Sequence, residues 1–232
     1  MKFASVASGC ERWMAGATVP RHRHAAAYAA IVLAGGYEES GNRGRFRVGP
    51  GDVLFHGAFD CHLDRFGAVG ARIFNLVMPN VIEPRLTVAH LPDADRIVRT
   101  AERDPCVAAE TLLAEAASIH NASLDWQDVL AAELAEAKTV LLGAWASRYG
   151  LAAETVSRGF EKLFGVPPRV YRAELRARRA LARVAGGVES LAEIAADTGF
   201  ADQAHMTRAI VALTGAPPTT WRRSNGFKTA DR

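Results

Sequence analysis

Two segments in the C-terminal part of the chain repeat one another at an offset of 50 residues, from Gly165 to Gly215. The first reads GVPPRVYR at residues 165–172, and the second reads GAPPTTWR at residues 215–222. Upstream of each lies a similar block that ends in glycine and an apolar residue, LGAWASRYGL at 142–151 and LAEIAADTGF at 191–200. A repeat of this kind indicates one helical substructure that is built twice.

The second copy is predicted to be two helices joined by a tight turn. Ser190 and Glu193 have the spacing of a helix-capping box, and Gly199 supplies the positive φ that a sharp turn requires. The helix that follows, residues 202–213, is expected to end at Gly215, because the two prolines after this glycine prevent its continuation.

The first copy repeats this pattern, with Gly150 at the turn and a second helix over residues 153–164. Two helices joined in this way form a helix-turn-helix unit, whose second helix can lie in the major groove of DNA. A pair of ordinary helical hairpins is the alternative, which the presence of two copies in register disfavours.

The charge of the chain divides unevenly and supports DNA as the partner. Residues 1–140 carry 14 Lys and Arg against 17 Asp and Glu, a net charge of −3, whereas residues 141–232 carry 14 against 8, a net charge of +6. The overall charge of +3 conceals this asymmetry. A basic half of this kind is typical of nucleic-acid binding. Most basic residues are Arg, which suits bidentate contacts to guanine and phosphate.

Helical periodicity identifies candidate contacts to bases. The residues expected to face away from the core are Glu154, Ser157 and Arg158 on the first helix and Gln203, Thr207 and Arg208 on the second. Arginine can donate to guanine, glutamine can bond adenine, and glutamate can accept from cytosine. Glu154 has an alternative role, because a negative side chain near a helix N-terminus is stabilised by the helix dipole. Candidate phosphate contacts are Lys162, Arg169, Arg172, His205 and Arg222. His205 could instead pack against its neighbours. Arg169, Arg172 and Arg222 could instead brace the turn.

Residues 125–223 resemble the DNA-binding domain of the AraC/XylS family of bacterial transcription regulators. The resemblance rests on LAEIAADTGFADQAHMTR at 191–208, followed by the GAPPTTWR segment, while the first copy is a looser match. It implies two helix-turn-helix units joined by a long helix, here residues 171–185. It also implies recognition helices that enter successive major grooves on one face of the DNA.

The N-terminal part is predicted to consist of strands rather than helices. Strand-like runs are predicted at residues 28–33, 45–48, 52–55 and 71–77, separated by GG, GNRG, GPGD and GAVG turns. Short strands with glycine turns are typical of an antiparallel sandwich or a small barrel. The β-rich part is expected to end near residues 84–95, and helical periodicity follows over 106–119 and 126–142.

Residues 10–80 resemble the two motifs of the cupin barrel, which AraC-type regulators often carry as an effector domain. The matching residues are Gly16, His22, His24 and Gly35 in the first motif, and Gly44, Pro50, Gly51 and His62 in the second. Tyr28 stands where metal-binding cupins have glutamate, which argues against a catalytic iron or manganese site.

His22, His24 and His62 are the candidate metal ligands of this barrel. His22 and His24 point to one face of a strand, and a third imidazole leaves an open position that suits Zn²⁺, Ni²⁺ or Fe²⁺. The alternative is that these histidines contact a small organic effector, with Tyr28 and His56 in the same pocket, or that they have no ligand.

Together these patterns predict an α+β chain in three parts: a cupin-like barrel over 1–90, a helical connector over 91–124 that forms either a domain interface or a dimer surface, and an all-α double helix-turn-helix domain over 125–232. With 49% apolar residues the chain can bury a core. We expect a non-enzymatic transcription regulator that binds double-stranded DNA and senses a small molecule or metal, with RNA polymerase and a second copy of the chain as further partners. A metal-dependent cupin oxygenase or isomerase is the alternative.

The chain is expected to be cytoplasmic. Its three cysteines lack paired spacing, no signal peptide is evident, and no apolar run is long enough to span a membrane.

Overall fold

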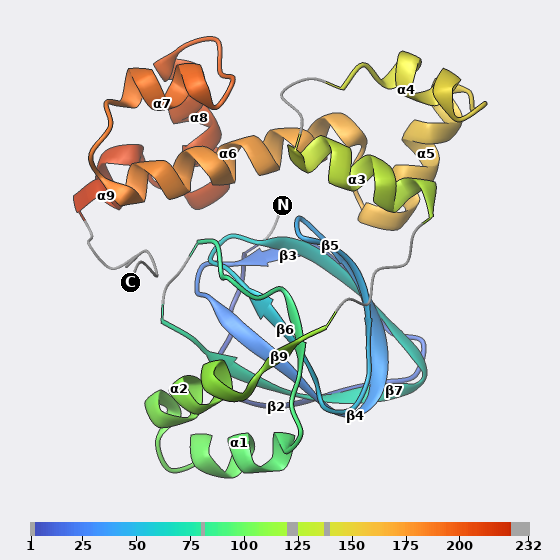
Figure 1. Ribbon diagram of the computed structural model, residues 1–232, viewed down its shortest axis with the longest axis vertical. Coiled ribbons are helices and arrows are strands. Elements are labelled where there is room, and N and C mark those ends of the chain that lie inside the picture. Colours follow the sequence, from blue (N-terminus) through green and yellow to red (C-terminus); the bar gives the residue numbers. More distant parts are fainter. Residues whose placement is uncertain (1–2, 80–81, 120–124, 137–139, 224–232) are drawn as a thin grey trace. The chain divides into compact units, whose positions relative to one another are not determined.

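A computed structural model describes residues 3–79, 82–119, 125–136 and 140–223 (Figure 1). The described residues divide into two compact units, an N-terminal unit over 3–119 and a C-terminal unit over 125–223. The N-terminal unit is built on a curled sheet and the C-terminal unit is all helical, so the predicted α+β fold class is confirmed.

The sheet is dominated by two long antiparallel strands, β4 (Tyr28–Gly41) and β7 (Cys61–Val77). Its order is β1-β3-β7-β4-β6-β8-β9, with β2 paired to β7 and β5 paired to β4. The shorter strands are β1 (Phe3–Ala4), β2 (Gly9–Trp13), β3 (Thr18–His24), β5 (Gly44–Val48), β6 (Asp52–His56), β8 (Val88–His90) and β9 (Ala117–Ser118). The long strands curve strongly (Figure 1). Side chains on their inner face line a pocket.

Both faces of β4 are buried at its start, which explains the continuous apolar run at residues 28–33. Ala29 and Ile31 belong to the core beneath the two N-terminal helices, whereas Tyr28, Ala30 and Val32 belong to the core inside the curled sheet. Side chains of a strand alternate between its faces, so one strand contributes to two cores.

Two of the predicted glycine turns are bends within strands. Gly35 lies inside β4 and Gly70 inside β7, and both have a positive φ, 71° and 69°. A Cβ on Gly35 would lie 2.0 Å from the Gly70 carbonyl oxygen, so the backbones meet where only glycine fits. The pairing of β4 with β7 is irregular here, which makes these segments bulges and corrects the prediction. The other two predicted turns, GNRG and GPGD, do separate strands.

The predicted connector includes two helices that belong to the N-terminal unit. Helices α1 (Ala94–Ala101) and α2 (Pro105–Glu115) pack on the outer face of the sheet (Figure 1). Ile97 and Leu112 are fully buried in the same core as Ile31 and Leu76. Their apolar stripes therefore cover the sheet, and the described part of the connector is not a separate segment.

The C-terminal unit contains the repeat as two successive sets of helices. The first is α4 (Leu142–Arg148), α5 (Ala153–Phe164) and the start of α6 (Pro168–Gly186). The second is α7 (Leu191–Asp197), α8 (Gln203–Thr214) and α9 (Pro218–Arg223), while α3 (Trp126–Glu136) packs in the core of the first set. Helices α5 and α8 have equal length and lie 50 residues apart, as the repeat predicts.

Local signals explain where these helices begin and end. The capping box is present at α7, where the Ser190 hydroxyl accepts from the Glu193 amide and the Glu193 carboxylate accepts from the Ser190 amide. Gly165 and Gly215 end α5 and α8 with φ of 74° and 79°. The prolines beyond these glycines begin the next helix, because an N-terminal helical position needs no amide hydrogen. Across the described residues, no helix combines the length and apolar character that crossing a bilayer requires.

Candidate functional site

The second helix of each helix-turn-helix unit buries one stripe and exposes the other. Val156 and Phe160 of α5, and Met206 and Ile210 of α8, are fully buried. The predicted base-contacting side chains lie opposite: Glu154, Arg158, Gln203 and Arg208 are exposed, and Ser157 and Thr207 are half-buried. The structure therefore leaves all six accessible at their surface, as a DNA-reading role requires.

Arg158 and Arg208 occupy the same position, the sixth residue, in α5 and α8. Arg158 is paired with Glu154 one turn earlier, with 3.4 Å between Nη1 and Oε1. Both side chains are more than 70% exposed, so this ion pair is weak.

The predicted phosphate contacts divide into exposed and bracing residues. Lys162 and Arg169 are exposed. Arg222 is half-buried and donates to the Glu189 carbonyl oxygen at 2.6 Å, which ties α9 to the loop before α7. The His205 ring meets Phe200 edge-on at 5.2 Å, which fits the packing role better than a phosphate contact. Arg172 is also half-buried.

Two arginines of α6 stabilise the second helix-turn-helix unit. Arg176 donates to the Gly199 carbonyl oxygen at 3.1 Å and lies 4.6 Å from the centre of the Phe200 ring. Arg183 bonds both Glu189 and Asp197. The arginine excess is therefore partly structural, because these side chains fix the turn that precedes α8.

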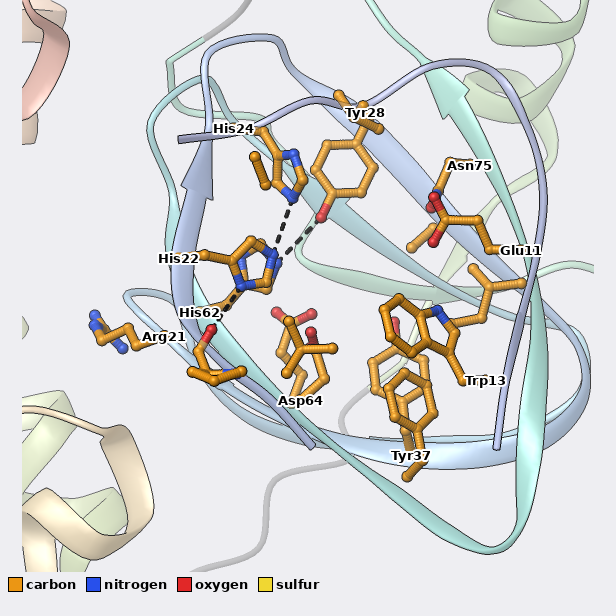
Figure 2. A pocket seen from close by; sticks show the side chains of 18 of the residues that line it. Glu11, Trp13, Arg21, His22, His24, Tyr28, Tyr37, His62, Asp64 and Asn75 are labelled. Carbon is orange, nitrogen blue, oxygen red and sulfur yellow. Dashed lines mark hydrogen bonds between the residues drawn. The ribbon is translucent and has the colours of Figure 1, made fainter. Parts of the chain in front are cut away.

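The curled sheet encloses a pocket of about 500 Å³ (Figure 2). One side is aromatic, with Trp13, Tyr37 and Phe66, and the other carries the three predicted metal ligands and Tyr28. Glu11, Arg21, Glu39 and Asp64 add ionisable side chains to the lining. An aromatic wall with a few convergent polar groups is typical of a small-molecule site.

The three predicted metal ligands come together in this pocket. His22 and His24 lie on β3, and His62 lies opposite His22 on β7. The Nε2 atoms of His22 and His24 are 3.1 Å apart, and one ligand atom from each of the three residues falls within 4.8 Å of the others. Nitrogens this close can converge on one ion, so the donor set fits a transition metal.

Tyr28 and His56 both contact this cluster, but only Tyr28 lines the large pocket; His56 lines a small separate cavity, which corrects the prediction that both lie in one pocket. The Tyr28 hydroxyl lies 3.2 Å from His62 Nε2, and its ring stacks on His56 at 4.3 Å. Burial raises the pKa of Tyr28 well above its ordinary value, so the hydroxyl stays protonated and can donate to His62.

Burial keeps the histidines neutral. Desolvation lowers the pKa of His24 to about 4 and, with the nearby imidazoles, lowers the pKa of His56 and His62 well below the ordinary value. Desolvation lowers the pKa of His22 as well. Neutral imidazole is the form that binds metal, so the cluster is ready for an ion at neutral pH.

The sequence prediction missed Glu39 and Asp64. They face each other across β4 and β7, and Glu39 is 6% and Asp64 8% exposed. Burial and the neighbouring Asp64 raise the pKa of Glu39 well above its ordinary value, and burial raises the pKa of Asp64 to about 7. Glu39 also forms a second group of potential ligands with His56 and His62.

Comparison with known proteins bears on the C-terminal unit. Residues 145–224 match the family model described as a helix-turn-helix domain. No relative among curated proteins matches the chain.

Solved structures of similar proteins include several regulators. ToxT from Vibrio cholerae is 7% identical and aligns over 96% of this chain and 99% of its own, with a TM-score of 0.43. An AraC-type DNA-binding protein from Chromobacterium violaceum is 20% identical over 43% of this chain and 90% of its own, with a TM-score of 0.39. The C-terminal domain of the response regulator yesN from Fusobacterium nucleatum is 21% identical over 42% and 93%, with a TM-score of 0.36. TM-scores this low add nothing to the fold described above.

The matched residues run from the end of α4 through α9 and include the exposed faces of α5 and α8. The chain thus carries, over residues 145–224, a helix-turn-helix domain.

Proposed function

We propose that this protein is a transcription regulator whose DNA affinity responds to a ligand in the N-terminal pocket. The observation that supports it most is the pairing of two equivalent exposed helices, α5 and α8, with a separate unit that encloses a 500 Å³ pocket. A ligand that binds one arrangement of the protein better than another shifts the population toward it and so changes DNA binding.

The two reading helices are proposed to contact bases through Arg158 and Arg208, which can each hold a guanine, and through Gln203, which can hold an adenine. Arg169 and Lys162 are proposed to contact phosphates. Equivalent positions in the two helices support a bipartite operator with one half-site for each helix.

Selection of bound fragments from genomic DNA, followed by electrophoretic shift, tests this proposal. We expect a recurrent sequence motif with two half-sites and protection of both in footprints. Binding that shows no sequence preference at any salt concentration would contradict it.

The histidine cluster supports a transition metal as one class of effector, with an organic ligand beside the aromatic wall as the other. Calorimetric titration with Zn²⁺, Ni²⁺ and Fe²⁺ of the wild type and of His24→Ala separates them. Tight binding that the substitution abolishes supports a metal held by the three histidines, and equally weak binding by both proteins supports an organic effector.

An enzymatic role as an oxygenase or isomerase is the second candidate, since three imidazoles also suit catalytic metals. The DNA-binding domain favours regulation instead. RNA polymerase and a second copy of the chain are proposed partners, and a DNA-binding regulator is expected to work in the cytoplasm.

A further inference from the structure

A second group of potential ligands lies beside the three-histidine cluster. Glu39 on β4, His56 on β6 and His62 on β7 each offer an atom, and these atoms lie within 4.8 Å of one another. All three side chains are buried, with exposures of 6%, 5% and 3%. The group shares only His62 with the predicted cluster.

Two nitrogens of this group lack a hydrogen-bond partner among the described residues. They are His56 Nε2 and His62 Nδ1, both shielded from solvent. His56 Nε2 lies 3.4 Å from Glu39 Oε2, but the geometry is not that of a hydrogen bond. Buried polar atoms are normally satisfied, so an orphaned nitrogen next to a carboxylate indicates a missing partner.

A small cavity coincides with the group. It has a volume of about 10 Å³ and is lined by Glu39, His56, Asp60 and His62 among others. This is room for one small particle, such as a metal ion or a single water molecule. It is distinct from the 500 Å³ pocket, although Glu39 and His62 line both.

We propose that Glu39, His56 and His62 bind one divalent transition-metal ion in this small cavity. Two neutral imidazoles and one carboxylate, formed when Glu39 releases its proton to solvent as the ion binds, suit Zn²⁺, Fe²⁺, Ni²⁺ or Co²⁺. Glu39 supplies the carboxylate that the Tyr28 position lacks, but from a different part of β4. The assignment adds to the proposed sensing role and does not depend on it, because the ion is detected without DNA.

Titration of the full chain with Co²⁺ alone tests the site, in a background with the exposed Cys10 and Cys106 changed to serine. We expect one ion per chain, and an affinity at least about tenfold lower in Glu39→Gln and in His56→Asn. His90→Asn is the matched control, because His90 is half-exposed and lies outside both ligand groups. It should bind Co²⁺ like the wild type.

His24→Asn distinguishes the two groups. Retained Co²⁺ affinity in this variant supports the proposed site, whereas a loss equal to that of Glu39→Gln places the ion among the three histidines and overturns it. Absence of Co²⁺ binding by the wild type also overturns it.

Soaking wild-type crystals in Zn²⁺ tests the site without substitution of any buried residue. Anomalous scattering within about 2.2 Å of Glu39, His56 and His62 supports the site. An ion between His22 and His24 with none at Glu39 and His56, or a water molecule alone in the small cavity, would rule it out.

Discussion

At the scale of single residues, the two candidate reading arginines differ in their surroundings. Arg158 has Glu154 one turn away, whereas Ala204 takes the corresponding place before Arg208. Arg208 is therefore the better test of base reading, because no acidic side chain of its own helix competes for it at this spacing.

Arg208→Ala should reduce discrimination at one base pair of the selected operator by about 1–3 kcal/mol, because a bidentate arginine–guanine contact is lost. Competition binding with single-base variants of the operator measures this. Arg99→Ala removes the same charge from α1 and should leave the preference unchanged. Equal weakening on every sequence would assign Arg208 to a phosphate.

His24 links pH to stability. Its pKa is about 4 in the folded protein, against an ordinary value near 6.5, because burial disfavours the charged form. As the pH falls below 6.5, His24 is protonated in the unfolded chain before it is protonated in the folded protein. The free energy of unfolding therefore decreases between about pH 6.5 and pH 4.

In metal-free protein, the melting temperature of the wild type should fall relative to that of His24→Asn as the pH is lowered from 7 to 4. Thermal unfolding of both proteins with a chelator present measures the difference. The comparison cancels the opposite contribution of the Glu39–Asp64 pair, whose raised pKa values favour the fold at low pH. A difference that does not change with pH would contradict the burial argument.

At the scale of elements, the repeat was predictable almost to the residue and the pocket was not. Helices α5 and α8 are specified locally by apolar spacing and a terminal glycine, all within one short segment. Glu39 escaped prediction because it lies 11 residues after Tyr28 on the same strand, a spacing that in a regular strand puts two side chains on opposite faces. The bulge between Val32 and Tyr37 changes the facing, and both residues line the pocket.

The same bulge gives a prediction about the strand. Gly35→Ala should lower the melting temperature of the protein markedly, corresponding to more than about 1 kcal/mol, because its φ is 71° and its Cβ would clash with the Gly70 carbonyl. Gly143→Ala is the control, since this helical glycine of α4 has no atom within 4 Å of an added Cβ. That substitution should be neutral or stabilising. A Gly35→Ala protein as stable as the wild type would refute the close approach.

At the scale of the whole molecule, the positive charge is concentrated in the C-terminal part of the chain. The excess of +6 over residues 141–232 includes arginines that brace α6 and α7, such as Arg183, so only part of it is available to DNA. Affinity that depends on phosphate contacts falls linearly with the logarithm of salt concentration.

Arg169→Ala should weaken binding similarly on all sequences and reduce the salt slope by about 1, since one phosphate contact is lost. Measurement of affinity across a series of salt concentrations tests this. Glu161→Gln is a useful counterpart, because removal of a negative charge from the exposed side of α5 should strengthen binding. A slope that Arg169→Ala leaves unchanged would remove Arg169 from the phosphate contacts.

The start of strand β4 separates the pocket from the core beneath α1 and α2. Tyr28 lines the pocket on one side of it and contacts His62 and His56, while Ala29 and Ile31 on the other side belong to the core that holds Ile97 and Leu112. Close-packed interiors do not absorb displacement locally. An occupant that moves Tyr28 is therefore expected to strain the packing of Ala29 and Ile31 against α1 and α2, two helices that it never touches.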